Sequence, residues 1–256
     1  METVSQLAQR AAALLGAGKI ADALAAYDAI LRIEPRNAHA LHYSGLAFYQ
    51  SGDVGQAIVR LRASLAADGR QSDAWSNLGL VLQAAGQPGP ALDACERAAA
   101  LDPASPEILV NLAATQSTCG QHARAEATAR RLIALDATRA KAWFVLAVAL
   151  KEQGRALTAL DAVSKAAVLD PTQQAFAAQK AQLEAAIGAP ERARKTLESA
   201  LARLPASVPL RFELASLLER ELRDLPRAAA EYAQVLRLDP RHGATLSQLA
   251  FLRGRL

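Results

Sequence analysis

Histidine and cysteine are the side chains of this chain with the clearest potential for metal or nucleophilic chemistry. His39 and His42 are three residues apart, and on a helix this spacing would place two imidazoles on one face, as two metal ligands require. No other histidine or cysteine is near them in the sequence, so we expect no metal site. Cys95 and Cys119 do not form a CxxC pair, and we expect both to be free thiols.

Motifs of known catalytic sites are missing from the sequence. The chain contains no G-x-S-x-G nucleophile elbow, no Walker phosphate loop and no HExxH zinc motif. Its acidic residues are interleaved with arginines, a pattern typical of exposed helix faces that pair opposite charges. We therefore expect no active site within this chain and no cofactor.

A strict repeat indicates which elements position the remaining side chains. Glycine recurs every 34 residues, an alanine follows five residues later, and a third column twelve residues further on is mostly proline. The glycines are Gly18, Gly52, Gly86, Gly120, Gly154 and Gly188. A period of this length is typical of repeat arrays, in which each unit packs on its neighbours.

Each repeat is predicted to hold two helices, one on either side of its glycine. Trp75, Leu78 and Leu82 share one face of a first helix. Ala159 and Val163 do the same for a second helix. Glycine suits the left-handed exit of the first helix, and proline ends the second because it lacks a donor N–H.

These residues resemble the tetratricopeptide repeat, a helix–turn–helix family with a period of 34 residues. The signature W-x-x-L-G-x-x-L matches residues 75–82, and Gly86, Ala91 and Pro103 follow at the family's spacing. The resemblance implies an all-α, right-handed superhelical solenoid of about seven repeats. It predicts a single array over residues 1–256, with repeats at 4–37, 38–71, 72–105, 106–139, 140–173, 174–207 and 208–242 and a C-terminal helix at 243–256.

Repeats six and seven depart from the regular pattern. Lys180 and Glu184 occupy positions of repeat six that are apolar in most other repeats. Leu222 stands where repeat seven would have its turn glycine, and the interval between Pro205 and Pro240 grows to 35 residues. We therefore predict an insertion within residues 219–225.

The segment after residue 242 is predicted to be one more first-type helix. Leu246, Leu249 and Ala250 are in register to face a core, but no second helix follows to cover them. Two alternatives fit: the helix caps the array, or the chain is the repeat region of a larger, bacterial-type protein. Phe251 and Leu252 favour further chain or an interface, because terminal repeats need a polar outer face.

The side of the first helices that faces away from the core is the expected binding surface. Counted from the start of each repeat, positions 4, 7, 8 and 11 face the core, so positions 2, 5, 6, 9, 12 and 13 lie opposite. We call this opposite side the inner face, since in the family that the chain resembles it lines the concave groove. Partner binding is predicted there, mainly in repeats two to five, by His39, His42, Tyr43, Leu46, Tyr49, Asn77, Leu80, Asn111, Lys141, Phe144, Val148 and Lys151.

Two patterns on the inner face each fit two interpretations. Leu46, Leu80, Ala114 and Val148 form an apolar stripe at position 9, which suits either an extended peptide or packing against the neighbouring repeat. Asn77 and Asn111 are one period apart. Their amides have the donors and acceptors to hold a peptide backbone, and they equally suit solvent.

Lys141 and Lys151 stand on either side of Phe144 in repeat five. This arrangement suits an acidic group beside an apolar anchor, and it equally suits two solvated lysines. Chaperone-binding members of the family use a clamp of basic residues and asparagine for a C-terminal carboxylate. Repeats one to three hold no lysine or arginine at the corresponding positions, so that ligand is not predicted.

The sequence thus predicts a non-enzymatic scaffold that binds a partner protein or peptide. An alternative is the substrate-recruiting region of a larger enzyme, because Asn77 and Asn111 are similar to the asparagine ladder of the O-linked N-acetylglucosamine transferase family. Self-association into a homo-oligomer through the inner face or the end repeats is a third possibility.

Charge and hydropathy narrow the classes of partner. The net charge of +4 arises from 29 basic and 25 acidic residues that are interleaved, without the basic stripe typical of a nucleic-acid binder. No apolar stretch has the length of a membrane span, and residues 1–9 lack the apolar core of a signal peptide. We therefore expect a cytoplasmic protein that binds neither nucleic acid nor membranes.

Overall fold

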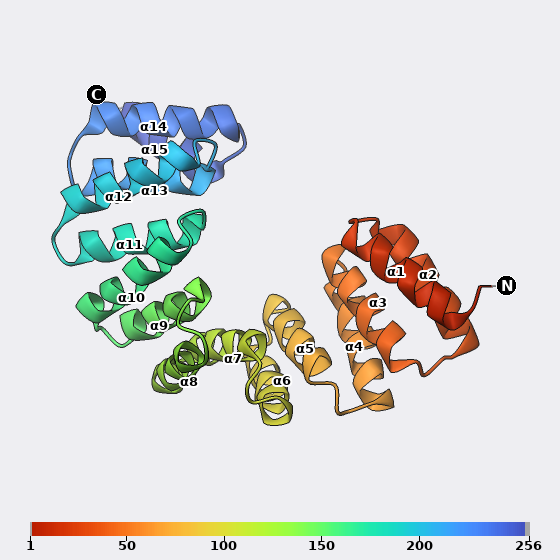
Figure 1. Cartoon of the computed structure of the whole chain (residues 1–256). Helices are drawn as coiled ribbons and strands as arrows, with labels where there is room; N and C mark the ends of the chain where they lie inside the picture. The colour runs from red at the N-terminus through yellow and green to blue at the C-terminus, as the bar shows by residue number, and fades with distance from the viewer. Residues whose placement is uncertain (1, 254–256) are drawn as a thin grey trace. The chain divides into compact units, whose positions relative to one another are not determined.

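The computed structural model describes residues 2–253, which form fifteen helices and no strand (Figure 1). Each predicted repeat start is the first residue of an odd-numbered helix. The helices are α1 (Val4–Gly16), α2 (Ile20–Ile33), α3 (Ala38–Gln50), α4 (Val54–Ala67), α5 (Ser72–Ala84), α6 (Pro88–Leu101), α7 (Pro106–Thr118), α8 (His122–Leu135), α9 (Ala140–Glu152), α10 (Ala156–Leu169), α11 (Gln174–Ala186), α12 (Pro190–Arg203), α13 (Val208–Arg220), α14 (Leu225–Leu238) and α15 (Gly243–Arg253).

Contacts divide the chain into two compact units, residues 1–128 and 129–256, with the boundary inside α8. In the first unit, α1, α3 and α5 each pack on the second helix of their own repeat, and α2, α4 and α6 each contact the next first helix. In the second unit, α9, α11 and α13 pack on α10, α12 and α14 in the same way. Successive first helices also contact one another, as α5 and α7 do in one unit and α11 and α13 in the other.

The turns follow the predicted glycine column. All six glycines have the left-handed backbone conformation, with φ between 70° and 88°. In repeat seven the left-handed residue is Arg223, with φ 58°, one residue beyond Leu222. Four residues join α13 to α14, whereas three join α11 to α12, so the extra residue lies in the loop 221–224.

Position 8 of the first helix is where its second helix comes closest. A Cβ atom on Gly79 would overlap the Sγ atom of Cys95 and lie 3.1 Å from the backbone oxygen of Ala91. A Cβ atom on Gly45 would lie 2.9 Å from Cγ of Leu61. Glycine at this position therefore sets the close approach of the two helices in repeats two and three.

Two tryptophans follow the turns that lack the terminal proline. Gly69 and Ala137 stand at the proline position of repeats two and four. The indole N–H of Trp75 donates to the backbone oxygen of Gly69 at 3.0 Å, and that of Trp143 donates to Ala137 at 2.8 Å. Each indole thus joins its own first helix to the turn before it.

The predicted register of the last helix holds for Leu249, which packs against the core of the last repeats, but not for Leu246 and Ala250. Thr245 and Leu252 of α15 are buried, whereas Leu246 is 49% exposed and Ala250 is also exposed. The predicted positions 4, 7 and 8 are those that a repeat buries against its own second helix. The helix that α15 packs on is α14 of the preceding repeat, and positions 3 and 10 are buried instead of positions 4 and 8. Residues 254–256 of the predicted helix lie outside the described residues.

Candidate partner-binding face

An aromatic cluster lies on the inner face of α3. The ring centroid of Tyr43 is 4.4 Å from that of His39, 4.8 Å from that of His42 and 6.4 Å from that of Tyr27 in α2. His39 is exposed and Tyr43 is half-buried. Ring contacts of this kind hold the aromatic side chains in fixed positions, which favours contact with a partner at low entropic cost.

Both predicted asparagines bond to the repeat before them. The side-chain N–H of Asn77 donates to Nε2 of His42 at 2.8 Å, and that of Asn111 donates to Oγ of Ser76 at 2.9 Å. Each bond joins position 6 of one repeat to position 5 of the preceding repeat. The amide donors therefore hold neighbouring first helices in register, and each side-chain carbonyl oxygen has no partner among the described residues.

His42 lies deeper than the sequence predicts. It is 5% exposed, because the neighbouring first helix covers it, so its ring is not available to a partner. Burial lowers the pKa of the His42 imidazole; the Asp73 carboxylate opposes this effect and His39 reinforces it. A neutral ring with its proton on Nδ1 is the form that accepts the Asn77 hydrogen bond at Nε2.

The apolar stripe at position 9 is partly covered. Leu80 on α5 is 36% exposed, while Leu46 on α3 and Val148 on α9 are half-buried. Tyr49 on α3 is also half-buried and packs against the core of repeats two and three. Leu80 is therefore the stripe residue that offers the most apolar surface to a partner.

Repeat five does not form the compact anion-binding site that its lysines suggested. Phe144 packs on Phe176 of α11, with ring centroids 4.7 Å apart, and so helps to join repeats five and six. Lys141 and Lys151 are exposed, and Nζ of Lys151 lies 3.5 Å from a carboxylate oxygen of Glu152. Ten residues of helix separate the two lysines, a rise of about 15 Å, which is too far for both to contact one carboxylate.

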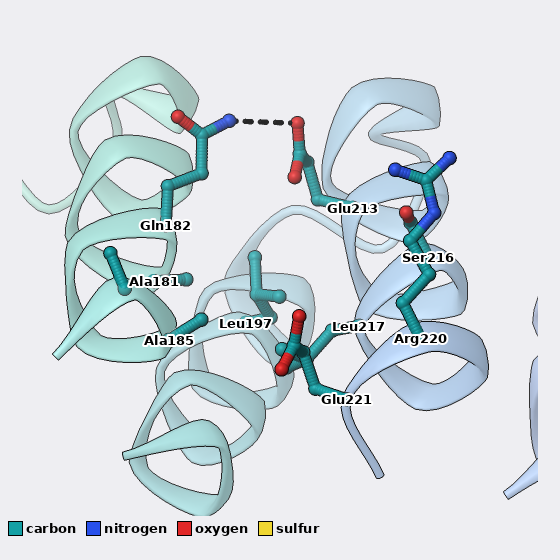
Figure 2. Close-up of a pocket in the computed structure, with 10 residues that line it drawn as sticks. Ala181, Gln182, Ala185, Leu197, Glu213, Ser216, Leu217, Arg220 and Glu221 are labelled. Carbon is teal, nitrogen blue, oxygen red and sulfur yellow. Dashed lines mark hydrogen bonds between the residues drawn. The ribbon is translucent and has the colours of Figure 1, made fainter. Parts of the chain in front are cut away.

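A pocket of about 310 Å³ opens on the inner face of repeats six and seven, between α11 and α13 (Figure 2). Small side chains of α11 make the hollow, and Leu197 of α12 lies beneath it, as Figure 2 shows. Gln182 bridges the two first helices, since its side-chain N–H donates to Oε1 of Glu213 at 2.9 Å. The pocket is lined by Ala181, Gln182, Ala185, Ala186, Leu197, Glu213, Ser216, Leu217, Arg220 and Glu221.

The sequence predicted partner binding on the inner face mainly in repeats two to five, so it did not predict this pocket of repeats six and seven. Most of its lining residues occupy inner-face positions of repeats six and seven. Alanines at Ala181, Ala185 and Ala186 carry no chemistry that would single them out in a sequence. The only signal was their small size, which leaves space between two first helices.

The structure also describes the side chains that could bind a metal ion, the two cysteines and the apolar character of the helices. Within residues 2–253, no group of three or more histidine, cysteine, aspartate or glutamate side chains is arranged to hold a metal ion. Cys95 is buried and Cys119 is half-buried, and both are free; burial raises the pKa of the Cys95 thiol, as expected for a structural cysteine. In the same range of residues, no helix combines the length and the apolar character of a membrane span.

Comparison with known proteins identifies the family. Tetratricopeptide repeat models match residues 14–81, 82–149 and 179–243. The chain belongs to the tetratricopeptide repeat family. Repeats of this family generally mediate protein–protein interaction, which is the class of function that the sequence predicted. No curated protein matches the chain.

Solved tetratricopeptide repeat structures share the fold. A protein from Parabacteroides merdae is 15% identical with a TM-score of 0.79, covering 98% of both chains. A thermophilic protein from Thermus thermophilus is 26% identical with a TM-score of 0.60, over 71% of this chain and 98% of that one. YrrB, described as having an unusual peptide-binding site, is 22% identical with a TM-score of 0.58, over 68% of this chain and 89% of its own.

Proposed function

We propose that this chain is a protein-interaction scaffold that binds a segment of a partner protein on the inner face of its first helices. The pocket between α11 and α13 is the observation that carries the proposal. It combines an apolar floor with hydrogen-bonding groups at the rim, the combination that binding sites generally use to hold and orient a ligand. YrrB, whose fold this chain shares, is described as having a peptide-binding site, and we propose the same class of ligand here.

The size and chemistry of the pocket suit one side chain of a partner. Its volume of about 310 Å³ admits a large apolar group but not a folded domain. Glu213 and Arg220 give the rim both signs of charge, so it has acceptors and donors for the flanking peptide backbone.

The enzyme-associated alternative gains no support from the asparagines. The amide donors of Asn77 and Asn111 bond to His42 and Ser76, so they serve the contacts between repeats. We therefore propose the scaffold alone.

A displayed library of random peptides, selected on the purified chain, tests this function. The exposed Ala186 lies at the edge of the pocket, and Ala186→Trp would fill it. Ala202→Trp places the same side chain on an exposed site of α12 outside the pocket and is the matched control. We expect Ala186→Trp to weaken the selected peptides by about tenfold or more and Ala202→Trp to leave their affinity unchanged.

Equal affinity of the selected peptides for both variants would show that they bind outside the pocket and would contradict the proposal. So would a selection that enriches no peptide although the chain is folded. A third outcome is that a second copy of the chain occupies the inner face. A molar mass that rises with concentration, in light scattering of the unliganded chain at two concentrations, would identify it.

A further inference from the structure

Lys180 of α11 breaks the core pattern of its repeat. It occupies position 7, where Leu78 and Leu112 are buried in earlier repeats and Leu214 is buried in the next. Lys180 itself is half-buried. A lysine at an apolar position loses hydration, and that loss is offset only where the ammonium group meets an anion or acceptors.

The side chain of Lys180 lines a pocket of about 490 Å³ between α10, α11 and α12. This pocket is distinct from the one between α11 and α13, and the two share no lining residue. Its lining mixes polar and apolar side chains and comes from three helices and one turn: Ser164, Ala167, Val168, Asp170, Pro171, Gln173, Ala177, Lys180, Lys195, Thr196, Ser199, Ala200 and Arg203.

Three cations line this pocket and have no partner among the described residues. Lys180, Lys195 and Arg203 line it, and among the described residues none of the three forms an ion pair or a hydrogen bond. Other cations of α12 differ: Arg194 is bonded to Glu191 at 2.8 Å and to Glu198 at 2.7 Å. The acidic residues of α12 are thus engaged by other arginines; of the three cations, Lys195 and Arg203 are exposed to solvent and Lys180 is half-buried.

The acidic groups close to the pocket already have partners. Asp170 lines it, and its carboxylate accepts from the Thr172 hydroxyl at 2.6 Å, the main reason that its pKa is lowered. Glu184 lies one turn after Lys180 on α11, and it accepts from the Thr196 hydroxyl at 2.7 Å. The lining therefore carries three positive charges and one negative charge, and the hydroxyls of Ser164 and Ser199 add donors.

We propose that this pocket binds a phosphoryl group, with Lys180, Lys195 and Arg203 as its cationic ligands. A phosphate dianion balances the net charge of the lining, and its oxygens accept from ammonium, guanidinium and hydroxyl donors alike. The ligand is free phosphate or a phosphorylated side chain, which present the same group. The site lies outside the inner face, so it goes beyond the scaffold function and does not depend on it.

Calorimetric titration of the full chain at low ionic strength tests the site, with inorganic phosphate and a phosphoserine tripeptide as separate probes. We expect saturable binding of at least one probe, and tighter binding of the tripeptide identifies the phosphorylated side chain as the source. Lys180→Leu restores the residue that position 7 carries in other repeats, so this variant folds at least as well as the parent. It should bind phosphate about tenfold more weakly or worse.

Lys141→Gln is the control for a general loss of positive charge, because Lys141 is exposed on α9 and does not line the pocket. Its affinity should match that of the parent chain. The proposal is overturned if neither probe saturates, if Lys180→Leu binds phosphate as well as the parent, or if Lys141→Gln weakens binding equally.

Discussion

In repeats two to four, inner-face asparagines bond to the first helix of the preceding repeat, whereas in repeats six and seven polar side chains line two pockets in addition to bonding across first helices. Asn77 and Asn111 illustrate the first arrangement, because each donates to the repeat before it. Lys180 illustrates the second, since it has no partner among the described residues. The comparison shows that polar side chains at position 6 join neighbouring repeats, whereas a lysine at the usually apolar position 7 of repeat six lines a pocket.

The two regions also differ in the hydrogen bonding of a buried tyrosine in the core. Tyr27 in repeat one and Tyr232 in repeat seven are both fully buried on second helices. The Tyr232 hydroxyl donates to buried Glu219 at 2.9 Å, whereas the Tyr27 hydroxyl has no hydrogen-bond partner among the described residues. Burial raises the pKa of Tyr27 to about 12, and the Tyr43 hydroxyl adds to the shift. The buried tyrosine of repeat seven is therefore paired with a buried acid, whereas that of repeat one is not.

The largest expected effect concerns the tight helix pairing of repeat three. Gly79→Leu should lower the free energy of unfolding by about 3 kcal/mol, because the new side chain meets Cys95 and the backbone of Ala91. Urea denaturation measures the change. Gly89→Ala on α6 is the control: its Cβ meets nothing within 4 Å, so stability should stay equal or rise. Equal losses in both variants would mean that position 8 is not where the helices are closest.

The two buried tyrosines provide the next test. Tyr232→Phe should destabilise the chain by about 2 kcal/mol, because it leaves the Glu219 carboxylate buried without that donor. Tyr27→Phe should be neutral or slightly stabilising, since it removes a hydroxyl without a partner. Thermal melts of the two variants compare these values directly. The contrast between the two ends of the array fails if Tyr27→Phe costs as much as Tyr232→Phe.

A smaller effect is expected from protonation of His42. Its pKa is lowered by burial, so the stability from the neutral ring is present above the ordinary pKa of 6.5 and decreases as the pH falls below it. Asp73 and His39 are the charged or titratable groups that act on it. His42→Gln should reduce the drop in melting temperature between neutral and mildly acidic pH. His39→Gln, at an exposed position, should retain the drop; the opposite result would assign the pH dependence to His39.

The smallest expected change in stability concerns the turn between α4 and α5, at the end of repeat two. Gly69→Pro should stabilise the chain by about 0.4–1 kcal/mol, because proline reduces the freedom of the unfolded chain. Asp68 before it is extended, with φ −145° and ψ 101°, as is Asp102 before Pro103, with φ −132° and ψ 88°. Urea denaturation again measures the change. A loss of stability would show that this turn differs from the turns that carry proline.

The sequence predicted the helices and turns because glycine, alanine and proline recur at fixed intervals. These residue types recur because the local backbone conformation at each turn and helix end favours them. Six left-handed turns and the extra residue near Arg223 could therefore be inferred without knowledge of any tertiary contact. The repeat frame also identified Lys180 and Glu184 as unusual residues for a core.

Contacts between repeats could not be inferred in the same way. A helical wheel places His42 opposite the core, yet the next first helix covers it. The same reasoning placed Leu246 in a core and missed Thr245, because α15 packs on α14 of the preceding repeat. Both pockets depend on how closely three helices approach, and side-chain size at single positions does not determine that distance.

Partner binding on the inner face is tested most directly by photo-crosslinking. A photoreactive residue at Gln182, on the pocket between α11 and α13, is compared with the same residue at Ala202, on an exposed site of α12. Both chains are irradiated with a peptide selected from the displayed library, and adducts are measured by mass spectrometry. Crosslinks from position 182 and not from position 202 are the expected result. Crosslinks from position 202 alone would contradict binding on the inner face.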